Sequence, residues 1–471
     1  MDRRATLRPR RAAPPPVFVS GPLLRHILVM TGTGAVGLMA IFLGDLVNMV
    51  FLGLLKDEAV LAAVGYGSSI LFLTTSIGIG LSIAATAAVA PAVGAGYRQR
   101  ARRLAVNAHL LTFIVSTALA ALVFVLVSPL LTLLGADGRT HDLAARYLYI
   151  LVPTTPLLAT GMTSMSVLRS VGDARRSMNV TLGGAVINTV LDPVFIFGLG
   201  LGLEGAAIAS AVARVAIMAI GLASVWRVHD MLGRPRRRTL VADTPVLAAV
   251  ALPAILTNIA TPVANAYVTS AIAPFGDGAV AGWAVVGRLI PVAFGASYAL
   301  SGSIGPVIGQ NYGARSFDRM RETVSKALAV MAAFTAVAWV LLALLAWPLV
   351  QLFHATGEAA DLIVLFCRWL APLFVFLGAT FIANAAFNTL GRPHVSTLIN
   401  WSRATLGTVP FVLAGGALAG AGGALAGNMI GAIPFGFLAV WLSYRLVDRL
   451  AAEHEAAVRG PSSRADGPPT G

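Results

Sequence analysis

Two stretches of the chain, V-A-P-A-V-G-A-G-Y (Val89–Tyr97) and I-G-P-V-I-G-Q-N-Y (Ile304–Tyr312), share a pattern of proline, glycine and tyrosine at a spacing of 215 residues. Two further pairs recur at spacings of 219 and 217 residues: L-R-S-V-G with F-N-T-L-G, and G-A-A-I-A-S with G-G-A-L-A-G. A nearly constant spacing of this kind indicates an internal repeat. The chain therefore consists of two related halves, joined near residues 233–244.

The composition predicts an integral membrane protein. Hydrophobic residues make up 57% of the 471 residues and charged residues 11%, and the mean hydropathy is +0.81. A soluble domain cannot bury this much apolar surface. A membrane-spanning helix needs roughly 20 apolar residues. We predict twelve such helices, at residues 25–53, 59–95, 105–134, 143–170, 178–199, 205–227, 245–273, 279–311, 327–353, 361–390, 394–420 and 421–444.

The predicted fold class is an all-α integral membrane protein with twelve transmembrane helices in two six-helix lobes. An even number of spans returns the chain to the same side, so the halves share one orientation and are related by an axis along the membrane normal. A cavity between the lobes, opening alternately to each face, is the expected substrate site. The predicted segments are a disordered basic arm (1–22), an N-terminal lobe (23–232), a cytoplasmic linker (233–244), a C-terminal lobe (245–446) and a disordered tail (447–471).

The formal net charge of +14 indicates membrane topology rather than nucleic-acid binding. Arginines gather in the N-terminal arm and in the connections after the even-numbered spans, whereas the opposite connections carry mostly acids. The positive-inside rule assigns such basic connections to the cytoplasm. We predict a multi-pass protein of the bacterial plasma membrane, with both termini in the cytoplasm and no nucleic-acid partner. The basic connections include Arg98, Arg100, Arg102, Arg103, Arg175, Arg176, Arg234, Arg236, Arg237, Arg238, Arg315, Arg319 and Arg321.

One acid lies in the middle of an apolar span. Residues Ile187–Gly198 read I-N-T-V-L-D-P-V-F-I-F-G, with Asn188 and Asp192 one helical turn apart and Pro193 next. An ionisable side chain at the membrane centre costs roughly 2.5 to 3.5 kcal/mol, so it usually faces the protein interior and marks an ion or substrate path. Burial disfavours the anion, and the proline kinks the helix and frees polar backbone that Asn188 or water can satisfy. We predict that Asp192 takes up and releases a proton during transport; an acid kept neutral for packing alone is the alternative.

Four motifs together resemble the multidrug and toxic compound extrusion (MATE) family. They are L-R-S-V-G-D (Leu168–Asp173), the stretch around Asp192, G-L-G-L-E-G-A-A-I-A-S (Gly200–Ser210) and P-V-I-G-Q-N-Y-G-A-R (Pro306–Arg315). The resemblance covers about residues 23–446. It implies a V-shaped pair of six-helix lobes and a cation-coupled exporter of amphipathic, often cationic organic compounds.

The resemblance also implies a cation site in the N-terminal lobe, to which Asn188, Asp192 and Ser210 belong. The acids lie mainly in this lobe, which resembles the proton-coupled, DinF-like branch of the family. At the 217-residue spacing, Asn188 and Asp192 correspond to Thr405 and Val409 in the second half. A sodium site built from carboxylates is therefore not expected there, and we predict proton rather than sodium coupling.

The first span departs from the family pattern. Relatives carry an acid in a pattern like L-V-D-x-x-F-x-G, whereas Leu46–Gly53 reads L-V-N-M-V-F-L-G and places Asn48 there. Asp45 lies three residues earlier, on nearly the same helix face. We predict that Asp45 and Asn48 have exchanged roles, so that Asp45 and Asp192 supply two carboxylates to one pocket. A local pairing of Asp45 with a hydroxyl or with Arg214 is the alternative.

Two arginines inside predicted spans are candidate charge partners. Arg214 lies one turn after Ser210, and Arg288 lies well inside the eighth span. A buried arginine normally has a carboxylate or carbonyl partner, so Arg214 would pair with Asp192 when the proton is absent. Snorkelling toward an interface explains Arg288 about as well.

An enzyme is not expected. The seven histidines are scattered, Cys367 is the only cysteine, and neither an acidic cluster nor a G-x-x-x-x-G-K phosphate loop occurs. We expect no metal and no cofactor, and a monomer whose partners are protons, the lipid bilayer and small amphipathic substrates. Two alternatives remain open, namely a flippase for a lipid-linked or amphipathic head group and a dedicated exporter of one metabolite. A flippase for an anionic carrier needs several basic residues in the cavity, where Arg214 and Arg288 are the candidates.

Overall fold

A computed structural model of the chain describes residues 16–459, and all regular secondary structure in this range is helical. The N-terminal lobe contains α1 (Leu23–Gly53), α2 (Glu58–Gly94), α3 (Arg98–Leu133), α4 (Gly138–Leu151), η1 (Val152–Thr154), α5 (Thr155–Ser170), α6 (Ala174–Pro193), η2 (Val194–Gly198), α7 (Gly202–Ala223) and η3 (Ser224–Val228). The C-terminal lobe contains α8 (Arg237–Ile272), η4 (Ala273–Phe275), α9 (Asp277–Ala293), α10 (Gly295–Gly313), α11 (Phe317–Leu352), α12 (Glu358–Leu365), η5 (Phe366–Leu370), η6 (Ala371–Leu373), α13 (Phe374–Thr389), α14 (Pro393–Ser402), η7 (Arg403–Gly407), α15 (Val409–Ile430) and α16 (Ala432–Arg459).

The helices form the predicted two lobes of membrane spans. Within the described residues, ten helical stretches are long and apolar enough to cross a membrane, and the pair α9 and α10, bent by 51°, forms an eleventh span. The last stretch, Pro393–Val458, contains two spans because the chain turns back at Ala419 and Gly420. Gly420 has a φ of +60°, a conformation that glycine adopts without steric cost.

Glycines hold these last two spans close together. A Cβ added to Gly427 would collide with the carbonyl of Phe411, and one added to Gly431 would collide with the carbonyl of Gly407. Without side chains at these positions, the two helix backbones can approach each other directly.

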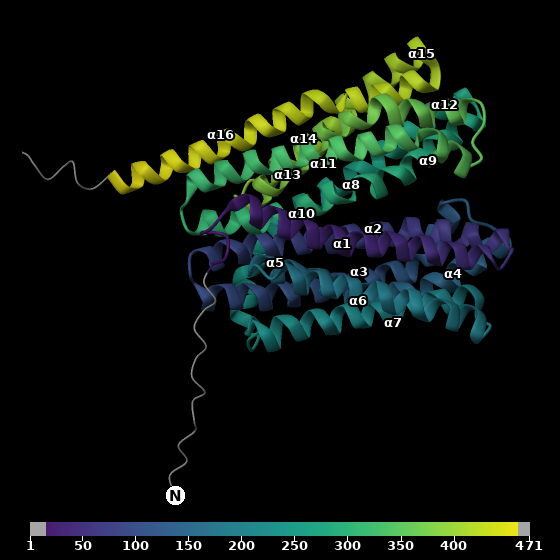
Figure 1. The fold of residues 1–471 in the computed structure, drawn as a ribbon. Coiled ribbons are helices and arrows are strands. Elements are labelled where there is room, and N and C mark those ends of the chain that lie inside the picture. Colours follow the sequence, from purple (N-terminus) through teal and green to yellow (C-terminus); the bar gives the residue numbers. More distant parts are fainter. Residues whose placement is uncertain (1–15, 460–471) are drawn as a thin grey trace, which may run out of the picture.

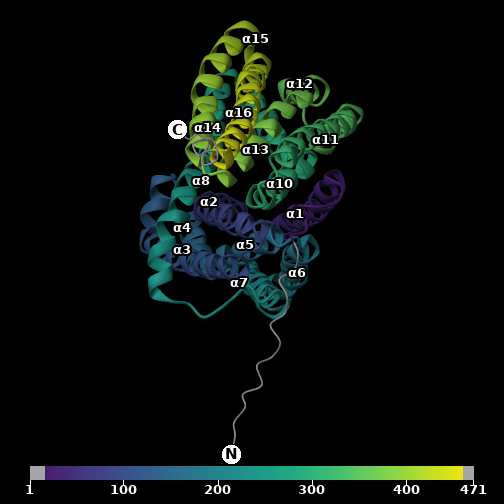
Figure 2. The same cartoon turned by 90° about the vertical axis from the view of Figure 1, so that its left-hand side faces the viewer.

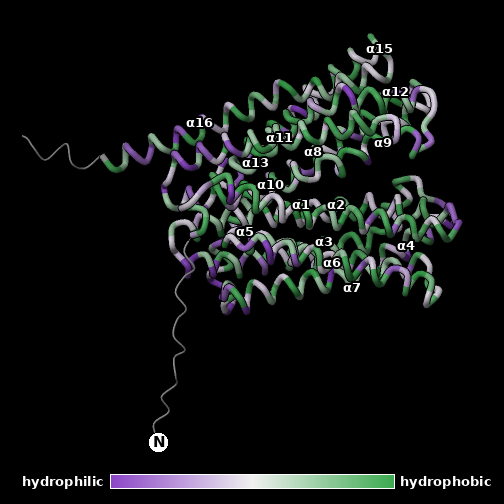
Figure 3. The backbone as a smooth tube through the Cα atoms, viewed as in Figure 1, coloured by the Kyte–Doolittle hydropathy of each residue, from purple (hydrophilic) through white to green (hydrophobic). Residues whose placement is uncertain are grey.

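The two lobes meet at one end of the molecule and diverge toward the other, as Figure 1 shows. Viewed along the long axis, α1 to α7 and α9 to α16 form two groups, and α8 lies between them beside α2 (Figure 2). We call the end where the lobes meet the closed end and the opposite end the splayed end. Hydrophilic residues gather mainly at these two ends, with apolar helix between them (Figure 3).

The repeated proline–glycine segments themselves close the structure. They lie on α2 and α10, where Gly94 faces the carbonyl of Gln310 and Gly313 faces the carbonyl of Pro91; a Cβ on either glycine would collide with that oxygen. The buried Gln310 side chain also donates to the carbonyl of Ser170 at 2.8 Å and accepts from the amide of Phe18 at 2.9 Å. The two repeated segments therefore form part of the contact surface between the halves of the chain to which they belong.

Three of the predicted segment boundaries are wrong. Phe18, in the expected disordered arm, is buried at 1% exposure between the lobes, where Gln310 binds its amide. Helix α8 begins at Arg237, so most of the expected linker is helical, and its Asp243 carboxylate accepts bonds from Arg103 (2.9 Å) and Asn107 (2.6 Å) of α3.

The expected tail is also partly ordered, because α16 continues to Arg459. Arg449 and Glu453, one turn apart, form an ion pair of 2.9 Å that favours the helix. The remaining parts of the predicted arm and tail, residues 1–15 and 460–471, lie outside the described residues.

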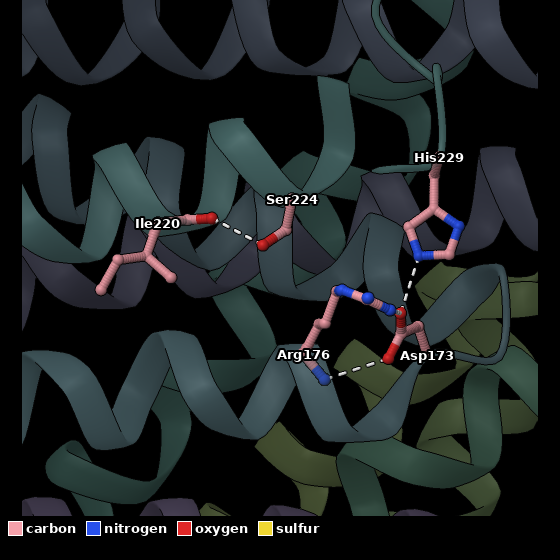
Figure 4. A network of polar contacts seen from close by, with 5 residues as sticks. All are labelled: Asp173, Arg176, Ile220, Ser224 and His229. Atoms are coloured by element: carbon pink, nitrogen blue, oxygen red, sulfur yellow. Dashed lines mark hydrogen bonds and ion pairs between the residues drawn. The ribbon is translucent and has the colours of Figure 1, made fainter. Parts of the chain in front are cut away.

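At the closed end of the N-terminal lobe, the L-R-S-V-G-D motif ends in a helix cap (Figure 4). The Asp173 carboxylate accepts a bond from the backbone amide of Arg176 at 3.0 Å, and it pairs with the Arg176 guanidinium at 2.6 Å and with His229 Nε2 at 2.7 Å. Partial burial opposes the charge, but the bonds from His229 and Arg176 prevail and hold the pKa of Asp173 well below its ordinary value. The cap therefore ties the start of α6 to the chain that follows α7.

Candidate functional site

The candidate site begins with the close packing of α1 against α6. Gly37 of α1 lies against Thr181 of α6, and Gly44 lies against Thr189. Seven residues span about two helical turns, so both glycines lie on one face of α1. One turn beyond Gly44 on this face is Asn48, which the packing brings to α6 at the level of the buried acid.

Asp192 is fully buried at 0% exposure, and both of its hydrogen bonds reach the same oxygen. Its Oδ2 accepts from Asn48 Nδ2 at 2.8 Å and from Asn188 Nδ2 at 3.1 Å. Its Oδ1 and the Oδ1 of Asn188 are buried without a partner. Two neutral amides therefore hold the carboxyl in place while one of its oxygens stays available.

The helix changes form directly after this acid. Pro193 ends α6, and Val194–Gly198 continues as a π-helical turn. A local break at the proline was expected, and π-helical turns inside helices often mark functional sites. Of the two groups expected to satisfy the freed backbone, Asn188 or water, Asn188 uses its amide group to bind Asp192.

Asp45 lies in the same region but does not touch Asp192 through a hydrogen bond. Its side chain is exposed on α1, and its carboxyl interacts electrostatically with that of Asp192. The buried Tyr147 of α4 lies within electrostatic range of both acids and of Arg214. The two carboxylates thus share one region of the lobe, with Asn48 rather than Asp45 in direct contact with Asp192. The proposed exchange of roles between Asp45 and Asn48 stays a prediction.

The remaining candidates lie around this centre without joining it. Ser210 is half-buried on α7 and forms no hydrogen bond with Asn48, Asn188 or Asp192 within the described residues. Arg214 Nη1 donates to the carbonyl of Leu151 at 2.9 Å and to Thr154 Oγ1 at 3.0 Å, so in this conformation its partners are in the α4–α5 connection and not at Asp192. Arg288 is exposed on α9, and none of the ion pairs among the described residues includes it.

The sequence matches a known family in both lobes. The MatE family model matches residues 35–194 and 253–413, one segment in each half. The chain belongs to the MATE family. This MATE chain is thus a multi-pass membrane protein of a transporter family, and the two matched segments begin at corresponding parts of its internal repeat.

Known relatives cover almost the whole MATE chain. It is 30% identical over 444 residues to the FAD transporter of Shewanella oneidensis, which covers 92% of this chain and 97% of that protein. The multidrug export protein MepA of Staphylococcus haemolyticus is 21% identical over 423 residues, or 89% of this chain and 93% of MepA. The Vibrio cholerae MATE transporter VcmN in its bent form superposes with a TM-score of 0.86 at 27% identity, covering 92% of this chain and 98% of that chain.

An arginine that the sequence analysis missed lies inside the C-terminal lobe of this MATE transporter. Arg403, at the start of the π-helical turn η7, is 6% exposed, and its Nη2 donates to Thr261 Oγ1 of α8 at 3.3 Å. Its Nε is buried without a partner, and no acid of the described residues forms an ion pair with it. Its signal was available in the sequence, since Arg403 is a charge in the middle of the predicted span 394–420.

Proposed function

We propose that this MATE transporter exports amphipathic organic compounds, many of them cationic, in exchange for protons that bind in its N-terminal lobe. The observation that supports the proposal is the Asp192 carboxyl, buried at 0% exposure with one oxygen held by two amides and the other without a donor. A buried carboxylate with so few donors is costly as an anion, and a bound proton removes this cost. Asp192 is therefore the proton-binding group of the proposed cycle.

The neighbours of Asp192 suit a group that changes its charge. Asn48 and Asn188 donate hydrogen bonds without carrying a counter-charge, so they position the carboxyl without locking it as an anion. Asp45 of α1 lies in the same region, so that a second carboxyl is close to Asp192 without bonding to it. Arg214, now bound to Leu151 and Thr154, is the cation that the anionic site attracts after proton release.

The topology of the proposed exporter follows from its charges. The arginine-rich connections belong to the cytoplasmic side, so both termini face the cytoplasm of a bacterial cell and the protein resides in the plasma membrane. The splayed end then faces outward. Because Asp45 and Asp192 belong to the N-terminal lobe, we assign the protein to the proton-coupled, DinF-like branch.

Proteoliposomes test the coupling directly. Ethidium accumulation is measured after an imposed proton gradient, or after a sodium gradient at equal pH, with Asp192→Asn liposomes as the leak control. We expect accumulation that follows the proton gradient and collapses with a protonophore. Accumulation that responds to sodium alone would overturn the proton assignment.

A dedicated exporter of one anionic metabolite is the second candidate function. It is supported by the relative named FAD transporter, whose named substrate carries two phosphates, and by the buried cation Arg403. The same chemistry also keeps a head-group flippase open. Counter-flow of flavin adenine dinucleotide, ethidium and a short-chain phospholipid separates these functions, because the proposed multidrug exporter exchanges ethidium whereas a dedicated exporter or a flippase exchanges one anion.

A further inference from the structure

We propose that Arg403, with Thr261 and Tyr298, forms an anion-binding subsite inside the C-terminal lobe for the phosphate or carboxylate of an aromatic substrate. This inference rests on the proposed export function and names one class of substrate that the exporter accepts. It adds to the N-terminal proton site a second, oppositely charged site in the other lobe.

The first argument is that no acid of the described residues forms an ion pair with Arg403, and that its guanidinium has the Thr261 hydroxyl as its single hydrogen-bond partner there. A guanidinium carries several N–H donors, and burying its charge requires that they be satisfied. Arg214 in the other lobe meets a carbonyl and a hydroxyl at 2.9 and 3.0 Å, whereas Arg403 has a single longer bond of 3.3 Å to Thr261 and an unpartnered Nε. A carboxylate or phosphate would satisfy the remaining donors, because its oxygens match the fork of the guanidinium.

The second argument is the rigid support of this arginine. Asn400, one turn before Arg403, donates to the Oδ1 of Asn384 on α13 at 3.1 Å and to the carbonyl of Ser396 at 2.8 Å. On the other side, the Thr408 hydroxyl donates to the carbonyl of Arg403 at 3.0 Å across the π-helical turn. The backbone that carries the guanidinium is therefore fixed from both directions, as a binding group requires.

The third argument is an aromatic wall beside the charge. Tyr298 of α10 lies within electrostatic range of Arg403, and its ring centroid lies 5.3 Å from that of Phe381 and 5.9 Å from that of Phe374. Phe374 in turn stacks on Phe294 at 3.9 Å, and both are fully buried in the core of the lobe, so Tyr298 and Phe381 are the partly exposed rings of this group. Flat apolar rings next to one cation suit a substrate that combines a planar ring system with an anionic group.

The fourth argument is the level of the subsite in the molecule. The lobes touch where Gly80 of α2 faces Ile255 of α8, and Thr261 lies six residues further along α8, toward the splayed end. Six residues correspond to about 9 Å of helix rise. Thr261 therefore lies further toward the splayed end than the contact of Gly80 with Ile255.

Riboflavin and riboflavin 5′-phosphate test the proposal, because they share one ring system and differ by one phosphate. Binding of both to the full-length protein in detergent is measured by fluorescence for the wild type, Arg403→Gln, Arg403→Lys and Arg368→Gln, an exposed arginine of the same lobe. We expect Arg403→Gln to weaken binding of the phosphate form at least tenfold and that of riboflavin less than twofold. Arg403→Lys, which keeps the charge but not the fork, should be intermediate, and Arg368→Gln should match the wild type.

Several outcomes would overturn the subsite. An equal loss for both flavins would show a structural role of Arg403, and equal binding of the phosphate form by wild type and Arg403→Gln would show that this arginine binds no anion. If Arg403→Gln does not fold, Thr261→Val, which removes the hydroxyl at similar volume, must weaken binding of the phosphate form selectively. Competition by dihexanoyl phosphatidic acid without binding of riboflavin 5′-phosphate would assign the site to a lipid head group instead.

Failure of the subsite and failure of the proposed export function give different results. The flavin experiment measures equilibrium binding without a gradient. Ethidium transport driven by protons depends on Asp192 and should persist in Arg403→Gln. Loss of ethidium transport with retained, Arg403-dependent flavin binding would therefore refute only the exporter, and the reverse pattern would refute only the subsite.

Discussion

The two lobes have the same architecture but opposite charges in their interiors. Helix α6 of the N-terminal lobe carries Asp192, whereas the corresponding position of the C-terminal lobe is Val409 and the charged residue nearby is Arg403. Asp192 and Arg403 are both buried. The π-helical turn η2 begins two residues after Asp192, and the π-helical turn η7 begins at Arg403 itself. The helix packing of the repeat has thus been retained while its polar groups have diverged, and we propose that Asp192 binds a cation in one lobe and Arg403 an anion in the other.

The positions that agree between the halves are those where backbones touch. Pro91 and Gly94 of α2 match Pro306 and Gly309 of α10, and these helices meet across the closed end. A side chain at such a glycine would separate the helices, whereas a polar residue in the lobe interior can change as long as its partners change with it. Agreement at the backbone contacts therefore does not imply agreement at the interior polar positions, and the chemistry of each lobe must be established separately.

Replacement of Asp192 should have the largest effect on transport. It removes the buried carboxyl of α6, so that neither α6 nor the corresponding helix α14 carries one. We expect Asp192→Asn to reduce proton-driven ethidium transport to the level of empty liposomes, since the amide cannot exchange a proton. Expression and thermal stability should change little, because an amide can still meet Asn48 and Asn188. Transport is measured in proteoliposomes, with Val409→Asn as the matched change in the other lobe. Undiminished transport by Asp192→Asn would remove this acid from the mechanism.

Replacement of the second acid of the N-terminal lobe, Asp45, should have a smaller effect than replacement of Asp192. Asp45→Asn should lower proton-driven transport about tenfold, corresponding to roughly 1.4 kcal/mol, because it removes the second carboxyl near Asp192. Adding Asn48→Asp to this variant should restore part of the transport if the two positions exchange roles. The initial rate of ethidium transport at several pH values measures both effects. A double variant no better than the single one would reject the exchange.

The membrane spans and the two lobes could be predicted from the sequence. Long apolar runs indicate the spans, and the internal repeat indicates the lobes. The spacing of one helical turn places Asn188 and Asp192 on one helix face, although their direct hydrogen bond was not part of the prediction. The contact of Asn48 with Asp192 requires the parallel packing of α1 and α6, which depends on Gly37 and Gly44 and is not visible in a local pattern.

Other features could not be predicted because they depend on contacts distant in the sequence. Phe18 lies in a polar, proline-rich context and is ordered by Gln310, which is 292 residues away. Arg403 is visible in the sequence as a charge inside the predicted span 394–420, but its burial depends on the packing of helices that are distant in the sequence. The partners of Arg214 in this conformation could not be predicted for the same reason, since the α4–α5 connection reaches it only in three dimensions; its pairing with a deprotonated Asp192 stays a prediction.

The closed end offers a test of the symmetric contact between the repeats. Gly94→Ala should force α2 away from α10, because its Cβ would collide with the carbonyl of Gln310. We expect the splayed end to close in part, and the rate of transport to fall several-fold. Spin labels at Asp137 and Glu358, on opposite lobes at the splayed end, report the distance in a Cys367→Ser background. Gly302→Ala on α10, where a Cβ meets open space, is the control, and an unchanged distance in Gly94→Ala would show that the contact does not set the conformation.

The smallest expected effect concerns the helix cap that only one half possesses. Asp173 caps α6, whereas the corresponding residue before α14 is Arg392, which makes no side-chain cap bond. Asp173→Ala should lower the free energy of unfolding by about 1 to 2 kcal/mol, and Arg392→Asp should raise it by a fraction of this amount, because an acid also suits the helix dipole.

The pH dependence of this effect distinguishes the cap from ordinary packing. Folding lowers the pKa of Asp173, so its contribution is complete above the ordinary pKa of about 3.9 and is lost as the pH falls below it. The unfolding temperatures of wild type and Asp173→Ala in detergent should therefore differ by a few degrees at pH 7, and the difference should begin to narrow as the pH falls below about 3.9. A difference that persists undiminished at low pH would show that Asp173 stabilises the lobe through its volume and not through its charge.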